Sequence, residues 1–240
     1  MRTAAVVTGG GSGIGAACAR RLAAAGHLVV LVGRRTEPLE QVAGEVAASG
    51  GAAEAFPADI RDWDRLGDLA DAIAGWSDRV DVVVNAAGGQ FHAPAEELTP
   101  NGWRAVVDTN LTGTFLVCRR LFPLLSQHGG AIVNVVASVW QRPFPGMAHS
   151  AAARAGVVSL TRTLALEWAR HGIRVNALSP GFTDTPAFRA QVRDLSGPAA
   201  RVPLRRVASA DEVAEAAMFL ACSTYTTGEV LTIDGGFQLT

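Results

Sequence analysis

Lysine is absent from this chain of 240 residues, because all 21 of its basic side chains are arginines. Tyrosine occurs once, as Tyr225 near the end of the chain. No lysine can therefore act as a base, form a Schiff base or lower the pKa of a neighbouring acid. Tyr225 lies far in the sequence from every motif described below, and we expect it to be a structural residue.

A surplus of charge is missing as well. The chain has 21 basic and 22 acidic residues, which gives a formal net charge of −1 at pH 7. Nucleic acid and anionic membranes attract a basic surplus, so neither partner is expected. No apolar run reaches the ~20 residues of a membrane span, and the segment from Met1 to Thr8 has no signal-peptide core, so we expect a cytoplasmic protein.

Cysteine is scarce and widely spaced. Cys18, Cys118 and Cys222 form no C-x-x-C pair. This spacing favours free thiols, buried as small hydrophobic groups in a reducing compartment. We therefore expect neither a disulfide framework nor a metal site.

The apolar segments that are present predict the fold class. Hydrophobic residues make up 49% of the chain, which is enough for a core, and we expect one domain over residues 1–240. The apolar runs are continuous, as in strands that helices cover on both faces, and the intervals between them are long enough for crossover helices. They predict an α/β, doubly wound Rossmann fold, with a seven-stranded parallel sheet and helices on both faces. The predicted strands are Ala4–Thr8, Leu28–Val32, Ala53–Phe56, Val80–Val84, Ala131–Val136, Ile173–Ala177 and Val230–Ile233.

Helical patterns fill the intervals between these strands. The stretch from Pro180 to Pro203, rich in Gly, Pro and Arg, instead predicts a mobile segment over a site at the carboxyl ends of the strands. Asp211, followed by Glu212, is predicted to cap the last helix. The predicted helices are Ile14–Ala25, Glu37–Ala48, Trp63–Gly75, Pro100–Leu125, Ala151–Arg170 and Asp211–Cys222.

A glycine-rich loop directly follows the first predicted strand and opens the first predicted helix. Glycines allow positive φ angles and let the backbone approach a pyrophosphate, whose charge the amide N–H groups at the helix start can meet. In this strand–turn–helix setting the loop predicts a dinucleotide site more strongly than a simple turn. Its predicted cofactor-binding residues are Gly9, Ser12, Gly13, Ile14 and Gly15.

Two arginines at the end of the second predicted strand indicate which dinucleotide binds. An NAD enzyme would place an acid here on the ribose 2′-hydroxyl, but the chain has Arg34 and Arg35. Arg34 can pair with a 2′-phosphate, which favours NADP(H). The alternative is that both arginines are simply solvated.

With these motifs in order, nearly the whole chain resembles the short-chain dehydrogenase/reductase family. The resemblance implies that Asp59 and Ile60 contact the adenine, that Asn85, Ala86, Ala87 and Gly88 line the adenine and ribose side, and that Pro180, Gly181 and Thr183 approach the nicotinamide. It also implies a homotetramer. The matching motifs are Thr8–Gly15, Asp59-Ile60, Asn85-Ala86-Ala87-Gly88, Asn110, Pro180-Gly181 and Ile233-Asp234-Gly235-Gly236.

The catalytic positions depart from the family's pattern. The resemblance implies a Tyr acid with a Lys four residues later, but these positions hold Ser150 and Arg154. The family's Ser position is Ala137, with Ser138 next to it, so only Asn110 is retained. A serine hydroxyl is no acid at neutral pH, so we expect catalysis of alcohol–ketone interconversion to be impaired. Arg154 lies on the same helix face as Ser150 and can still donate to the nicotinamide ribose.

Within the family, the chain is most similar to the peroxisomal trans-2-enoyl-CoA reductases. The related 2,4-dienoyl-CoA reductases are the second most similar group. The stretches that carry this resemblance are Asn85–Phe91, Thr109–Phe115, His149–Val157 and Leu164–Trp168. Conjugate reduction suits the missing tyrosine, because the charge that develops is an enolate, which needs hydrogen-bond donors more than full protonation. The predicted donors are Ser150, Ser138 and the Asn110 amide.

Other residues near this constellation are weaker candidates. His149 either protonates the substrate's α-carbon or is a residue at a helix start that faces solvent or caps the helix. Trp140, Phe144 and Met147, with Gln90 and Phe91, are candidates for an acyl pocket or for ordinary loop packing.

The sequence thus predicts an NADPH-dependent reductase of an α,β-unsaturated acyl thioester carried on CoA or acyl carrier protein. The predicted catalytic residues are Asn110, Ser138, His149, Ser150 and Arg154. One alternative is a ketoreductase or dehydrogenase whose acid comes from His149 or from the substrate. Another is a catalytically silent NADP-binding subunit.

Overall fold

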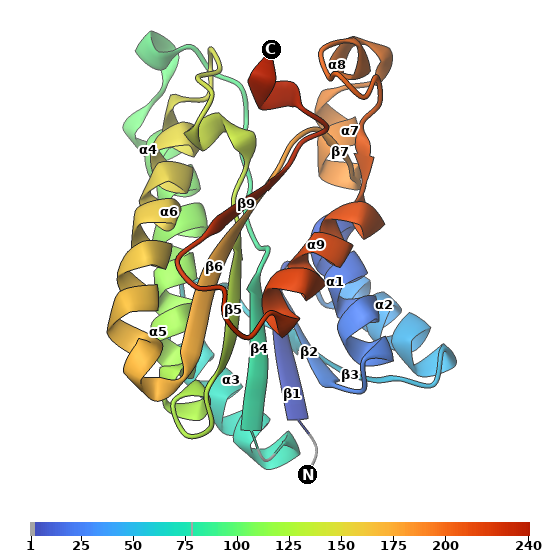
Figure 1. Cartoon of the computed structure of the whole chain (residues 1–240), viewed down its shortest axis with the longest axis vertical. Helices are drawn as coiled ribbons and strands as arrows, with labels where there is room; N and C mark the ends of the chain where they lie inside the picture. Colours follow the sequence, from blue (N-terminus) through green and yellow to red (C-terminus); the bar gives the residue numbers. More distant parts are fainter. Residues whose placement is uncertain (1–2, 78) are drawn as a thin grey trace.

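A computed structural model describes residues 3–77 and 79–240, and Figure 1 shows their arrangement. Seven parallel strands form one sheet in the order β3-β2-β1-β4-β5-β6-β9, which confirms the predicted sheet. Met1 and Arg2, at the start of the segment assessed above for a signal peptide, lie outside the described residues. The strands are β1 (Thr3–Thr8), β2 (Leu28–Gly33), β3 (Ala52–Pro57), β4 (Arg79–Asn85), β5 (Gly130–Val135), β6 (Ile173–Pro180) and β9 (Val230–Ile233).

Helices cover both faces of the sheet, as Figure 1 shows. On one face lie α1 (Gly13–Ala24), α2 (Thr36–Ala48) and α9 (Ala210–Cys222), and on the other lie α3 (Trp63–Trp76), α4 (Pro100–Val107), α5 (Gly113–Leu125) and α6 (Ala148–Trp168). Strand β2 is apolar throughout because both of its faces are buried. Val29 and Leu31 join the hydrophobic cluster on the α1 face, whereas Val30 and Val32 join the cluster on the α3 face.

The strand order reverses between β1 and β4. Residues after β1 build the sheet outward through β2 and β3, and residues after β4 build it in the other direction. Open α/β sheets bind ligands in the crevice at the carboxyl ends of such a strand pair. Here Thr8 pairs with Asn85, and the Thr8 hydroxyl accepts a hydrogen bond from the Ala87 amide at 3.1 Å.

The helix predicted over Pro100–Leu125 is not regular. A π-helical turn, Asp108–Thr112, separates α4 from α5. Asn110 lies in this turn, and both ends of its carboxamide bond to the Gly89 backbone. A side chain bound outside the helix in this way accounts for the widened turn, which apolar periodicity could not predict.

Two further expectations were wrong. Ser209 caps α9 instead of Asp211: the Ser209 hydroxyl accepts from the Glu212 amide at 3.1 Å, while the Glu212 carboxylate accepts from the Ser209 amide at 2.8 Å. This reciprocal pair provides acceptors for two backbone N–H groups at the start of the helix, whereas a single capping side chain would satisfy one. Cys222 is exposed at the end of α9, whereas Cys18 and Cys118 are buried as expected.

The stretch from Pro180 to Pro203 contains regular structure. It includes α7 (Pro186–Gln191), α8 (Ser196–Ala200) and β7 (Thr183–Asp184), which pairs with β8 (Ala208–Ser209). Its mobility stays a prediction. Within residues 3–77 and 79–240, no helix combines the length and apolarity needed to cross a membrane. Short 3₁₀ turns lie at Ala95–Glu97, Ser138–Trp140, Ala169–His171 and Phe237–Leu239.

Candidate active site

The glycine loop joins β1 to α1 at the strand crevice. Gly9 has a φ of +67°, and a Cβ added there would lie 2.9 Å from the Ala86 carbonyl oxygen and the Ala87 amide nitrogen. Only glycine lets these backbones meet. Gly13 and Gly15 form the start of α1, and the side chain of the N-cap residue Ser12 makes no capping hydrogen bond. The amide donors of this first turn are therefore available to an anion.

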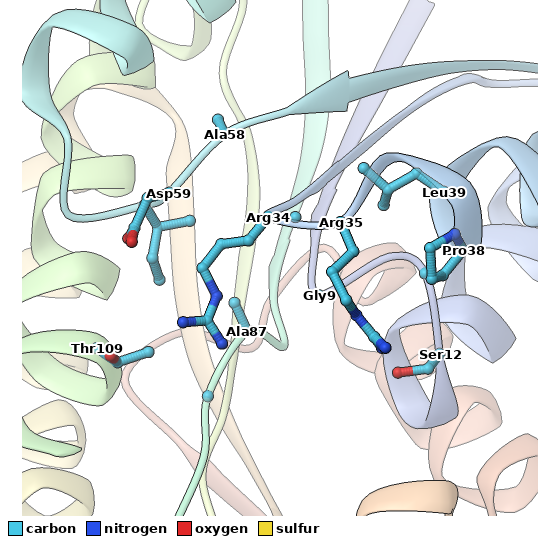
Figure 2. A pocket seen from close by; sticks show the side chains of 14 residues that line it. Gly9, Ser12, Arg34, Arg35, Pro38, Leu39, Ala58, Asp59, Ala87 and Thr109 are labelled. Atoms are coloured by element: carbon cyan, nitrogen blue, oxygen red, sulfur yellow. The ribbon is translucent and has the colours of Figure 1, made fainter. Parts of the chain in front are cut away.

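A cavity of about 210 Å³ opens beside this loop, and we call it the arginine cavity. Figure 2 shows Arg34 and Arg35 extending into it from the loop after β2, Arg34 on the side of Asp59 and Thr109 and Arg35 on the side of Ser12 and Pro38. Of the predicted cofactor residues, its lining includes Gly9, Ser12, Arg34, Arg35, Asp59, Ile60, Ala87 and Gly88.

The charges in the arginine cavity suit a phosphate. Within the described part of the chain, neither Arg34 nor Arg35 forms an ion pair. The one carboxylate of the lining, Asp59, pairs with Arg61 at 2.6 Å, and hydrogen bonds from Arg61 lower its pKa. Two unpaired guanidinium groups thus face a site whose carboxylate is already neutralised.

A larger cavity of about 580 Å³ lies at the carboxyl ends of β4, β5 and β6, and we call it the large cavity. Gly88 lines both cavities, so they adjoin, as a dinucleotide with a substrate at its far end requires. The predicted site residues in its lining are Ile14, Ala86, Gly88, Ser138, Arg154, Pro180, Gly181 and Thr183.

Arg154 reaches the large cavity from α6. Its Nη1 donates to the Val135 carbonyl oxygen at 2.7 Å, and burial lowers its pKa to about 10, so it stays charged at neutral pH. A Cβ on Gly88 would lie 2.6 Å from Nη2 of Arg154 and 2.4 Å from Oδ1 of Asn110. Gly88 is thus the residue that allows both side chains to approach the boundary between the cavities.

Two predicted asparagines line neither cavity. Asn110 is fully buried, its Oδ1 accepts from the Gly89 amide at 3.1 Å and its Nδ2 donates to the Gly89 carbonyl oxygen at 2.8 Å. Asn85 donates from Nδ2 to Oδ1 of Asn134 at 2.9 Å inside the protein. The side chain of Asn85 therefore connects β4 to β5 instead of facing the cofactor. The side chain of Asn110 holds the loop after β4 in place.

His149 and Ser150 are also enclosed, because α6 begins earlier than predicted. Both are fully buried in its first turn, and neither lines a cavity. Nδ1 of His149 accepts from the Ser150 amide at 2.8 Å, and burial lowers the pKa of His149, which keeps the ring neutral. Of the alternatives for His149, the solvent-facing one is wrong, and the absence of His149 from the cavity lining does not support the proton-donor one. Of the three predicted donors, only Ser138 faces the large cavity.

The large cavity contains one ionisable side chain that sequence reasoning missed. His92 lines it, with its ring against Gly146. Its position two residues after Gln90, in the loop following β4, was the available signal. Phe144 and Met147 line the cavity as expected, whereas Trp140 donates to the Ser179 hydroxyl at 3.1 Å and is absent from the lining.

Comparison with known proteins agrees with this geometry. The family model described as enoyl-(acyl carrier protein) reductase matches residues 9–238. The chain is 37% identical to a Bacillus subtilis protein named "probable 2,4-dienoyl-CoA reductase", over 98% of this chain and 96% of that protein.

Solved structures show the same fold over nearly the whole chain. A short-chain dehydrogenase/reductase family protein is 37% identical, with a TM-score of 0.89, over 98% of this chain and 97% of that one. A variant of the actinorhodin polyketide ketoreductase with NADPH is 34% identical, with a TM-score of 0.93, over 98% and 97%. The chain is therefore an NAD(P)(H)-dependent oxidoreductase that belongs to the short-chain dehydrogenase/reductase family.

Proposed function

We propose that this protein uses NADPH to reduce the carbon–carbon double bond of an α,β-unsaturated acyl thioester. The observation that carries the proposal is the side-chain chemistry of the large cavity. Its lining includes neither tyrosine nor lysine, and its ionisable members are Arg154 and His92. Tyr225 is fully exposed elsewhere. An alkoxide formed from a ketone would find no phenolic acid in this lining.

Conjugate reduction does not require these residues to protonate an alkoxide. When bound, NADPH would supply a hydride to the β-carbon, negative charge would spread over the α-carbon and the thioester oxygen, and a proton from water would then add to the α-carbon to give the saturated thioester. Neutral hydrogen-bond donors stabilise such an enolate. The Ser138 hydroxyl lines the large cavity and makes no hydrogen bond within the described residues, so it is free to donate.

The arginine cavity supports NADPH as the cofactor. A ribose 2′-hydroxyl would need an acceptor at the end of β2, but Arg34 and Arg35 stand there, and Asp59 is engaged by Arg61. A 2′-phosphate would meet two guanidinium groups. Arg154 is proposed to hold the nicotinamide ribose, and the glycine loop to hold the pyrophosphate.

The large cavity also supports an acyl substrate. Its apolar lining, which includes Val136, Val139, Phe144, Met147, Phe182 and Phe188, suits a hydrocarbon chain. We propose CoA or acyl carrier protein as the carrier, in agreement with the name of the Bacillus subtilis relative.

We further propose a cytoplasmic homotetramer. Large apolar side chains are exposed on α5 and α6, including Phe115 and Leu166, and near the end of the chain, including Phe219 and Leu239. Exposed apolar side chains on these helices are available for contacts between subunits. Light scattering of the purified protein at several concentrations measures the number of subunits.

A panel of enoyl and 3-oxoacyl thioesters of equal chain length tests the activity, with loss of NADPH absorbance as the readout. We expect the enoyl thioesters to have the higher kcat/KM by at least about tenfold, because the cavity lacks an acid matched to an alkoxide. A faster reaction with 3-oxoacyl thioesters or simple ketones would overturn the proposal.

His92 favours one second candidate, a ketoreductase with a displaced acid. It is the one imidazole in the lining of the large cavity. If His92 were that acid, His92→Phe would abolish reduction of 3-oxoacyl thioesters. Reduction of these substrates at the wild-type rate by His92→Phe excludes this candidate.

A further inference from the structure

Ser150 reaches the large cavity only through another side chain. Ser150 is fully buried, and its hydroxyl donates to Oε1 of Gln90 at 2.8 Å. Gln90 is half-buried and lines the large cavity, whereas Ser150 does not. The carboxamide of Gln90 therefore lies between the serine and the space where a substrate would sit.

This hydrogen bond determines which end of the carboxamide is free. Among the described residues, Oε1 of Gln90 is the one acceptor for the buried Ser150 hydroxyl, and a buried donor without an acceptor is costly. Oε1 is thereby occupied, while Nε2 of Gln90 donates to no atom of the described residues. Two N–H donors of a side chain in the cavity lining are left for a ligand.

The backbone beside Gln90 is fixed as well. Asn110 bonds to both the amide and the carbonyl of Gly89, the preceding residue. A donor held by its own backbone and by a buried hydroxyl loses little freedom when it binds. Such preorganised donors stabilise developing negative charge better than mobile ones.

We propose that Nε2 of Gln90 donates a hydrogen bond to the carbonyl oxygen of the substrate, and that Ser150 is a positioning residue that orients it. The identity of this oxygen as a thioester oxygen rests on the proposed function. As charge moves onto the oxygen, the hydrogen bond from Gln90 strengthens, and the amide keeps both of its protons. Ser150 itself touches no reacting atom.

The first test replaces Gln90 with residues of similar size. Gln90→Leu removes the donor, and we expect kcat for an enoyl thioester to fall about 100-fold, as for other oxyanion donors, with the Kd for NADPH changed less than about threefold. Gln127→Leu makes the same change in the exposed turn after α5, away from both cavities, and is expected to match the wild type.

Gln90→Glu adds a pH dependence of kcat that a merely structural role of Gln90 would not produce. At pH 8 the carboxylate has no proton to donate, and we expect a loss at least as large as that of Gln90→Leu. As the pH falls towards 5.5, the carboxyl group gains a proton, and kcat relative to wild type should rise. A ratio that stays flat with pH in this variant would contradict the donor role.

A double-mutant cycle tests the role of Ser150. We expect Ser150→Ala to lower kcat about fivefold when Gln90 is present and to have no further effect in the Gln90→Leu background. An equal loss in both backgrounds would mean that Ser150 acts on the substrate directly, and the assignment would fail.

The proposed function and this inference can fail separately. If 3-oxoacyl thioesters are the faster substrates, the proposed function fails, and the same variants are compared on those substrates, whose carbonyl oxygen needs the same donor. Binding of a saturated acyl thioester to the NADP⁺ complex gives a readout without turnover. Gln90→Leu should weaken it about fivefold, and an unchanged Kd together with an unchanged kcat would overturn the inference.

Discussion

Arg154→Met separates the stability of the protein from its activity. Burial lowers the Arg154 pKa from 12.5 to about 10, and at about 1.4 kcal/mol per unit the buried charge costs about 3–4 kcal/mol. The hydrogen bond to the Val135 carbonyl oxygen offsets about 1.5–3 kcal/mol of this. Because Arg154 is protonated in both folded and unfolded chains below pH 9, the cost is constant across neutral pH.

We therefore expect the free energy of unfolding in urea of the cofactor-free Arg154→Met protein to change by less than about 2.5 kcal/mol. If Arg154 holds the nicotinamide ribose, displacement of the ring by about 1 Å should lower kcat/KM on the order of 100-fold and weaken NADPH binding. Both are measured on the same preparation, the Kd by NADPH fluorescence.

Arg162→Met, at an exposed position on the same helix α6, is the matched control and should behave as the wild type. Wild-type kinetics in Arg154→Met would show that another group holds the ribose. A loss of several kcal/mol in stability would show instead that the guanidinium is mainly a structural group, and the reasoning from its buried charge would be refuted.

Two further predictions concern charge. Arg34→Ala should raise the Kd for NADPH about tenfold, which is the lower end for a charge-assisted contact because Arg34 is exposed. The Kd for NADH should change by less than about twofold. Equal losses of affinity for both cofactors in calorimetric titrations would remove the 2′-phosphate assignment. Burial lowers the pKa of His149, so the unfolded chain binds a proton there more readily, and stability should fall as the pH drops below about 6.5. His149→Asn, which keeps an acceptor for the Ser150 amide, should reduce that slope in urea titrations; parallel slopes would contradict it.

Local chemistry made the fold and the dinucleotide crevice predictable. The continuous apolar strands reflect burial on both faces, as Val29 and Val30 illustrate on opposite sides of β2. Glycines in the loop after β1 are required by backbone contact, which leaves a recognisable spacing. The location of Arg34 and Arg35 beside the dinucleotide crevice could be predicted because both residues directly follow a strand.

The directions of buried polar side chains were not predictable in this way. Asn85 and Asn110 occupy motif positions, yet their carboxamides bond to protein groups instead of facing a ligand. The contact between Gln90 and Ser150 joins residues 60 positions apart and depends on where α6 begins. Such pairings follow from tertiary packing, and no local pattern in the sequence encodes them.

The two walls of the large cavity differ in how firmly they are attached. Residues 88–90 are tied to Asn110 through both backbone groups of Gly89. The opposite wall, formed by α7, approaches them with the Gln191 amide 3.5 Å from the Gln90 carbonyl oxygen, at the limit of a hydrogen bond. Under the proposed function, displacement of α7 away from residues 88–90 would break this long hydrogen bond and would make room for a longer acyl chain, while the backbone at Gly89 would stay held by Asn110.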